Sequence, residues 1–213
     1  MYVRKVKNYL CGLRYYGFVC PPLILASASP QRRELLEGLG LPFTVRVSRV
    51  SEADVVEHDP VIRAQLLAKL KAEDVGPMHP GAYIIGCDTL VVAADGTLLE
   101  KPADAAEARS MIALQSGSVS TVHSGLCVLS PDGSVHAGVS SSSVHFKKMD
   151  DAELNWWVTS GCWRGRSGAF QIDGLGQLII EKISGDWTGV VGLPVFLLGE
   201  LLRKAGWPLG IGD

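Results

Sequence analysis

The sequence predicts an α/β fold, and three observations support this prediction. Apolar runs typical of buried strands alternate with segments whose apolar residues recur at helical spacing. At two places a helix-start signal, in which Ser or Asp precedes Pro, stands between a predicted strand and the predicted helix that follows it. With 213 residues, of which 47% are hydrophobic, the chain can fill the core of one large α/β domain or of two closely joined lobes. We therefore expect it to fold on its own.

Charge and cysteine content narrow the possible partners. A net charge of −2 gives no general attraction to nucleic acid or to an anionic membrane, so a small anion is a better ligand than DNA. The five cysteines are odd in number and form no pair of C-x-x-C motifs, which favours reduced thiols and argues against structural zinc. No apolar stretch is long enough to span a bilayer. We expect a cytoplasmic protein.

The first element is a strand, a polar turn and a helix start within residues 23–39. Ser29 suits the N-cap and Pro30 the first helical position. The free N–H groups of the first turn, the helix dipole and Arg32 or Arg33 could hold an anion. The sequence therefore predicts a phosphate-binding corner here, with an ordinary capped turn as the alternative.

The second helix follows a short strand and a polar loop. Asp59 caps it and Pro60 opens it. Its predicted apolar stripe consists of Ile62, Leu66, Leu67 and Leu70. Lys69 and Lys71 flank the stripe, and either could be a solvated surface lysine, so only one of them need contact a ligand.

Asp88 is the most informative polar residue, because it lies within the apolar strand predicted over residues 82–92. A carboxylate there is costly to desolvate unless it meets a cation, a metal or hydrogen-bond donors, and such positions are enriched in function. The alternative is a structural Asp at a strand bulge. Asp95 and Gly96 then form a tight hairpin turn, which could return Lys101 towards the same end of the sheet.

The remaining elements are expected in this order: a helix over 103–114, strands over 121–129 and 134–146, a helix through 156–158, a strand over 177–183 and a last helix from 192 to about 204. Asp150 and Glu153 resemble a capping box, and Trp156 and Trp157 are expected to be packing or interface residues. The glycine-rich segment 160–176 allows close backbone approach to a ligand. Its charged residues are Arg164, Arg166 and Asp173.

Several of these motifs, in this order, resemble the Maf family of nucleoside triphosphate pyrophosphatases. The resemblance runs from about residue 23 to 207, leaving 1–22 as an N-terminal extension and 208–213 as a C-terminal tail. The matching segments are Leu25–Leu36, Ser51–Glu52, Lys71, Gly86–Thr89, Glu100–Pro102, Ser116–Gly125 and Gly185–Pro194.

The resemblance implies an elongated α/β fold with a mixed twisted sheet flanked by helices, and a cleft between two lobes as in inosine triphosphate pyrophosphatases. It also implies a hydrolase of acid anhydrides that cleaves a nucleoside triphosphate to the monophosphate and pyrophosphate. Family members use a divalent metal, Mg²⁺ or Mn²⁺ and also Co²⁺, and commonly form homodimers. The alternative is a catalytically weak nucleotide- or nucleic-acid-binding regulator of cell division, consistent with inhibition of septum formation.

Carried over to this chain, the resemblance makes Asp88 the catalytic carboxylate and pairs it with Glu52 at the metal. The phosphates would be held by a set of polar and cationic side chains: Ser27, Arg32, Lys71 and Lys101.

Three positions bear on the nucleobase: Gln31, Thr89 and Asp173. Thr89 is typical of the branch that acts on thymidine and uridine triphosphates. Asp173 is closer to the Glu of the branch that acts on 7-methyl-GTP. The sequence leaves the choice between a pyrimidine and a guanine open.

Overall fold

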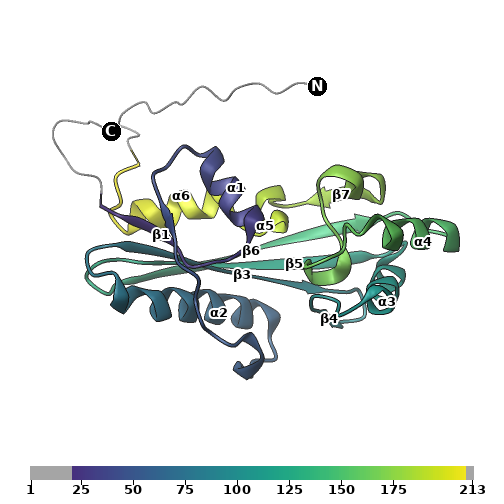
Figure 1. The fold of residues 1–213 in the computed structure, drawn as a ribbon, viewed down its shortest axis with the longest axis horizontal. Coiled ribbons are helices and arrows are strands. Elements are labelled where there is room, and N and C mark those ends of the chain that lie inside the picture. Colours follow the sequence, from purple (N-terminus) through teal and green to yellow (C-terminus); the bar gives the residue numbers. More distant parts are fainter. Residues whose placement is uncertain (1–20, 210–213) are drawn as a thin grey trace.

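The computed structural model describes residues 21–209, so most of the predicted N-terminal extension and C-terminal tail lies outside the described residues. It shows an elongated mixed α/β fold around one seven-stranded sheet (Figure 1). The strands are β1 (Leu23–Leu25), β2 (Thr44–Val45), β3 (Tyr83–Val92), β4 (Leu98–Leu99), β5 (Val119–Leu129), β6 (Val135–Phe146) and β7 (Ile180–Ser184). The α-helices are α1 (Pro30–Gly38), α2 (Pro60–Val75), α3 (Ala105–Gln115), α4 (Asp151–Ser160), α5 (Trp187–Val191) and α6 (Val195–Lys204). The predicted α/β class is confirmed.

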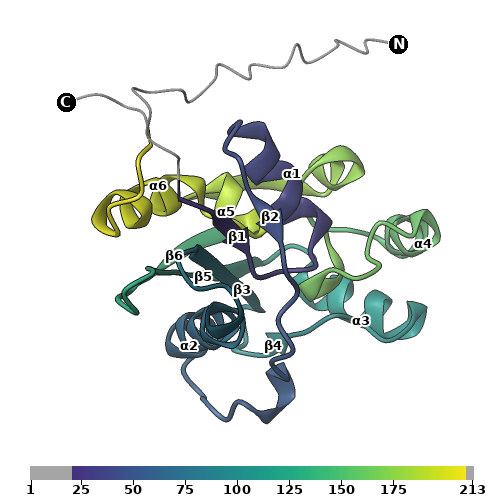
Figure 2. The same cartoon turned by 60° about the vertical axis from the view of Figure 1, so that its left-hand side comes forward.

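The sheet has the order β2-β1-β3-β5-β6-β7, with β4 paired to β3. Strand β1 is parallel to β2 and β3, whereas β3, β5, β6 and β7 pair antiparallel, so the sheet is mixed as expected. Figure 2 shows α2 on one face and α1, α5 and α6 on the other. Within the described residues, no helix is both long and apolar enough to cross a membrane.

Local signals placed the starts of α1, α2 and α4 correctly. The last helix, predicted from residue 192, begins at Val195 and follows a separate short helix, α5. Ser29 accepts a hydrogen bond from the Arg32 amide at the start of α1, and Asp59 accepts from two amides at the start of α2. Asp150 and Glu153 form the predicted capping box of α4. The 177–183 strand prediction was partly wrong, because a 3₁₀ segment over Gly174–Leu178 precedes β7.

Helix α2 buries a face that matches the predicted one only in part, because Leu67 is fully buried but Ile62 is not. Ile62 is 52% exposed, and the buried residues are Ala64, Leu67, Ala68, Lys71, Ala72 and Val75. The reason is close approach to two strand glycines: a Cβ at Gly86 or Gly125 would lie 2.0 Å from a backbone oxygen of α2. Small residues must therefore face the sheet, and this rotation also turns Lys71 inward.

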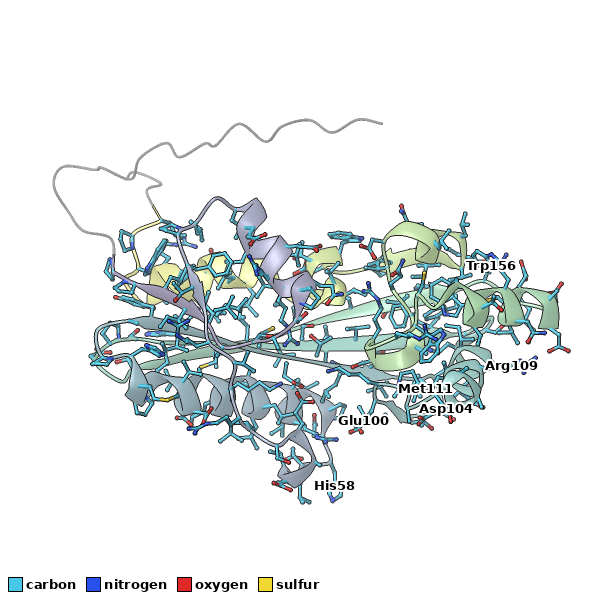
Figure 3. The ribbon with its side chains drawn as sticks, in the orientation of Figure 1. His58, Glu100, Asp104, Arg109, Met111 and Trp156 are labelled. Carbon is cyan, nitrogen blue, oxygen red and sulfur yellow. The ribbon has the colours of Figure 1, made fainter. Side chains whose placement is uncertain are left out.

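A second lobe forms at the other end of the sheet, where α3, α4 and residues 160–179 pack together; we call it the α3–α4 lobe. Its core includes Ile112, Phe170 and the fully buried Trp157. Trp156 is 40% exposed, so the two neighbouring tryptophans have different environments. Figure 3 shows Arg109, Met111 and Trp156 together at this end of the molecule. The cleft described next lies where this lobe meets the α1 corner.

Candidate active site

The corner between β1 and α1 holds Arg32 in one orientation. Its Nε donates to the Gly192 carbonyl at 2.9 Å, Nη1 donates to Ser27 Oγ at 3.1 Å, and Nη2 donates to Thr89 Oγ1 at 3.2 Å. Since a guanidinium has five N–H groups, two remain available to a ligand. Gln31 accepts from the Ser29 hydroxyl at 2.9 Å. The predicted corner thus presents a fixed, forked cation, which suits a phosphate.

Lys71 lies between two carboxylates. Its Nζ is 2.6 Å from Glu52 Oε1 and 2.6 Å from Asp88 Oδ1. Lys71 and Asp88 are buried, whereas Lys69 is partly exposed and pairs with Glu73 at 3.6 Å. Of the two lysines, Lys71 is the one whose side chain the structure brings to the carboxylates of the site.

Asp88 has an unused oxygen. Its Oδ1 is bound to Lys71, but within residues 21–209 the buried Oδ2 has no hydrogen-bond partner. An unsatisfied buried carboxylate oxygen is costly, and a functional role is one explanation for its retention. This atom is suited to accept a proton from a bound water or to coordinate a cation.

Glu52 is half-exposed, and two opposing effects act on its pKa. Partial burial disfavours the charged carboxylate, but the hydrogen bond and charge of Lys71, with the charges of Lys101 and Arg32, outweigh it. The pKa of Glu52 therefore lies below its usual value. Glu52 is ionised at neutral pH.

A cavity of about 370 Å³ joins these groups. Its lining includes all the predicted site residues: Ser27, Gln31, Arg32, Glu52, Lys71, Asp88, Thr89, Lys101 and Asp173. Arg166 also lines it, whereas Arg164 lies over the ring of Trp163 at 5.1 Å from its centroid and does not line the cavity. Three separate parts of the chain, the β1–α1 corner, β3 and the 160–179 segment, thus converge on one cleft.

Two contributors to the site carry no local sequence signal. Arg63 of α2 donates to the Glu52 carbonyl at 3.3 Å and lies 3.6 Å from the carboxylate of Glu100, which Figure 3 labels beyond the start of α2. The Gly192 carbonyl accepts from Arg32 and also from Cys87 Sγ at 2.9 Å. Burial raises the pKa of Cys87, so its thiol remains a donor. Both contacts depend on segments distant in the sequence.

The donor set fits a cation that arrives with a phosphorylated ligand. Among the described residues, no group of three or more His, Cys, Asp or Glu side chains could hold a metal ion. The cleft offers two carboxylates, Glu52 and Asp88, and the latter has the unpartnered Oδ2. Mg²⁺ commonly binds one or two carboxylates and completes its shell with substrate phosphates and water.

Comparison with solved structures finds a loose likeness. A nucleoside-triphosphatase, a dITP/XTP pyrophosphatase from Mycobacterium abscessus, overlaps with a TM-score of 0.43 and 11% identity, covering 87% of this chain and 95% of that one. A likeness at this level supports no conclusion about function.

Comparison with curated sequences finds much closer relatives. A dTTP/UTP pyrophosphatase of Deinococcus radiodurans is 45% identical, with 87% of this chain and 94% of the relative covered. A dTTP/UTP pyrophosphatase of Treponema denticola is 40% identical, with 85% and 96% covered. A family model described as "Maf-like protein" matches residues 22–205. The chain therefore belongs to the Maf-like protein family.

Proposed function

We propose that this protein hydrolyses dTTP or UTP to the nucleoside monophosphate and pyrophosphate. The observation that carries the proposal is the buried Asp88 carboxylate, whose Oδ2 is unpartnered, in a cleft that also presents Arg32 and Lys101. The pyrimidine substrate is supported by the relatives in Deinococcus radiodurans and Treponema denticola, which are dTTP/UTP pyrophosphatases.

In the proposed reaction, a water molecule attacks the α-phosphorus. Asp88 Oδ2 accepts the proton of this water, a new oxygen–phosphorus bond forms, and the bond from the α-phosphorus to the bridging oxygen breaks. Pyrophosphate leaves with the electron pair of that bond. A positioned general base typically contributes about 10²- to 10⁴-fold in rate, and Lys71 holds Oδ1 so that Oδ2 keeps one direction.

The phosphates carry about four negative charges, so the cleft must supply cations. In the described part of the chain, Arg32 and Lys101 form no ion pair with a carboxylate, and both line the cavity. We assign the phosphate contacts to these two residues, with Ser27 beside them. Lys71, which already contacts Glu52 and Asp88, would add a third positive charge beside the phosphates.

Glu52 and Asp88 would hold the divalent metal, Mg²⁺ or Mn²⁺. When bound, such an ion neutralises charge on the phosphates and lowers the pKa of a coordinated water. The short distances from Lys71 to both carboxylates bring Glu52 and Asp88 to the same point of the cleft, as a shared ion requires.

The base would lie against the 160–179 segment, at the opposite wall of the cleft. The Asp173 carboxylate is suited to accept from the N3–H group of thymine or uracil, and a charged acceptor makes this bond stronger than a neutral amide would. Thr89 contacts Arg32 and Ser124, which supports a role for it at the phosphate corner. Gln31 lines the cavity beside that corner.

The test is pyrophosphate release from a panel of dTTP, UTP, GTP and 7-methyl-GTP, with Mg²⁺ or Mn²⁺. We expect release of pyrophosphate rather than single phosphate, fastest with dTTP or UTP, and abolished by EDTA. Preference for 7-methyl-GTP would overturn the pyrimidine assignment. Nucleotide binding without release would favour a regulator instead of an enzyme.

The proposal also includes a homodimer in the cytoplasm, as the family resemblance implies. Cys87, Cys127 and Cys162 are free in the structure, which agrees with a reducing compartment. Light scattering on the full chain tests the dimer: the mass of a single chain would remove it from the proposal.

A further inference from the structure

A strained backbone segment lies within the wall of the cleft, between residues 165–167 and residues 170–173, which all line the cavity. Among residues 21–209, Ala169 is the one residue other than glycine with a positive φ, at 58°. Gly168 before it has a φ of 70°. The left-handed region is unfavourable for any residue with a Cβ, and such residues persist only where their surroundings hold them.

Two buried neutral side chains donate hydrogen bonds to the carbonyls of Gly168 and Ala169. Gln115 Nε2, at the end of α3, donates to the Gly168 carbonyl at 2.7 Å. Trp157 Nε1, on α4, donates to the Ala169 carbonyl at 2.9 Å. Both side chains are fully buried, and Ser120 Oγ fixes Gln115 by donating to its Oε1 at 3.0 Å. Two successive carbonyls are thus each bound to a side chain from a different helix.

The segment that follows is compact and forms the cleft wall. Residues 170–173 all line the cavity. Gln171 Nε2 donates to the Asp173 carbonyl at 3.0 Å, and a Cβ at Gly176 would come within 1.7 Å of the Gln171 carbonyl oxygen. Since this turn is closed on itself, its direction depends on the backbone at Gly168 and Ala169.

The need of buried Trp157 and Gln115 for hydrogen-bond acceptors does not by itself explain this arrangement. A buried tryptophan or glutamine could donate to a carbonyl in ordinary backbone, with no residue forced to positive φ. Here the forced residue and Gly168 lie between two stretches that line the cleft, residues 165–167 and residues 170–173. Strained residues held in this way cluster at ligand-binding sites.

We propose that Trp157 and Gln115 are positioning residues that set the direction of the base-binding wall, residues 170–173. This inference rests on the proposed function, since it assigns the wall to the nucleobase. Trp157 and Gln115 would touch no substrate, yet they would determine how tightly and how selectively the base is bound. They act through the Gly168 and Ala169 carbonyls.

Trp157→Phe and Gln115→Met remove one donor each while keeping an apolar or unbranched side chain of similar shape. We expect each to raise KM for the preferred pyrimidine nucleotide roughly fivefold, the effect of losing one neutral hydrogen bond. The fall in kcat should be smaller, because Asp88 and Arg32 are not displaced. The ratio of kcat/KM for the pyrimidine nucleotide to kcat/KM for GTP should fall as KM for the pyrimidine nucleotide rises.

Ile112→Val is the matched control, because Ile112 is fully buried in the same core and binds neither carbonyl. It should lower the melting temperature without changing KM. If Ile112→Val shifts KM as much as the two variants at equal loss of stability, Trp157 and Gln115 are merely structural, and the inference is overturned.

Ala169→Gly should restore the affinity lost in a variant. Glycine adopts a positive φ without strain, so the native backbone direction is kept more easily when one hydrogen bond is missing. In the Trp157→Phe background it should recover at least half of the lost affinity. Hydrogen exchange of the peptide over 165–173 gives a readout independent of activity: exchange should rise in Trp157→Phe and not in Ile112→Val. An inactive wild type would refute the proposed function, whereas an active wild type with unchanged KM and exchange in the variants would refute only this inference.

Discussion

The two walls of the cleft are built by different means. On the phosphate side, charged groups on regular elements face one another: Lys71 of α2, Asp88 of β3 and Arg32 of α1. On the opposite side, residues 170–173 belong to an irregular segment held by the neutral donors Gln115 and Trp157. The first wall acts through the charges of its side chains, whereas the shape of the second depends on the direction of its backbone.

Under the proposed function, this difference separates the residues that carry out the reaction from those that select the base. Charges on a helix and a strand keep their positions when substrates of different size enter, as phosphoryl chemistry requires. A loop whose direction is set by two hydrogen bonds can be changed without altering the chemistry. Changes on the phosphate side should therefore affect rate or folding, and changes on the other wall should affect the choice of base.

The largest effect is expected from Asp88→Asn. Asn keeps an oxygen for Lys71 but removes the base, so kcat should fall about 10²- to 10⁴-fold while the protein stays folded. Steady-state kinetics and a thermal melt measure this. Asp95→Asn, at an exposed turn position, is the control and should keep full activity. Activity of Asp88→Asn within a few-fold of wild type would remove Asp88 from the mechanism.

Lys71→Met should have the largest effect on stability. It leaves the buried Asp88 carboxylate without its cation, and breaking a buried pair in this way costs about 3–5 kcal/mol. Urea unfolding at pH 7 measures the loss. The double variant Lys71→Met/Asp88→Asn should recover part of it, since no buried charge remains. A double variant no more stable than Lys71→Met would show that Lys71 acts by packing rather than by its charge.

Asp173→Asn tests the opposite wall and should have a smaller effect. Replacing the charged acceptor by a neutral one should lower kcat/KM for dTTP or UTP by about 3- to 10-fold, mainly through KM. Asp132→Asn, at an exposed turn, is the matched control and should change neither constant. A fall in kcat as large as that of Asp88→Asn would mean that the two walls are not separable.

The smallest effect is expected from Glu52→Gln on stability. Because its pKa lies below the usual 4.5 in the folded protein, ionised Glu52 stabilises the fold above that value, and this contribution is lost as pH falls through the lower folded pKa. Because Glu52 is half-exposed, its pair with Lys71 should contribute less than about 1 kcal/mol at pH 7. Urea unfolding should show a difference from wild type that narrows below pH 4.5. A difference that grows on acidification would contradict the lowered pKa.

The sequence by itself determined the elements whose signals are local. The Ser29 cap, the Asp150 capping box and the carboxylate within β3 could all be recognised from neighbouring residues, because caps and strand patterns depend on short-range chemistry. The family resemblance added roles for residues that the structure places around one cavity. Both kinds of prediction concern which residues are present.

Only the tertiary structure decided which faces and directions those residues take. The inward turn of Lys71 follows from the approach of α2 to Gly86 and Gly125, and the prediction that Ile62 is buried was wrong for this reason. The orientation of Arg32 depends on the distant Gly192 carbonyl. The positive φ of Ala169 is held by side chains from two other helices. Contacts between distant segments leave no local pattern, because they depend on how closely two backbones can approach once the chain has folded.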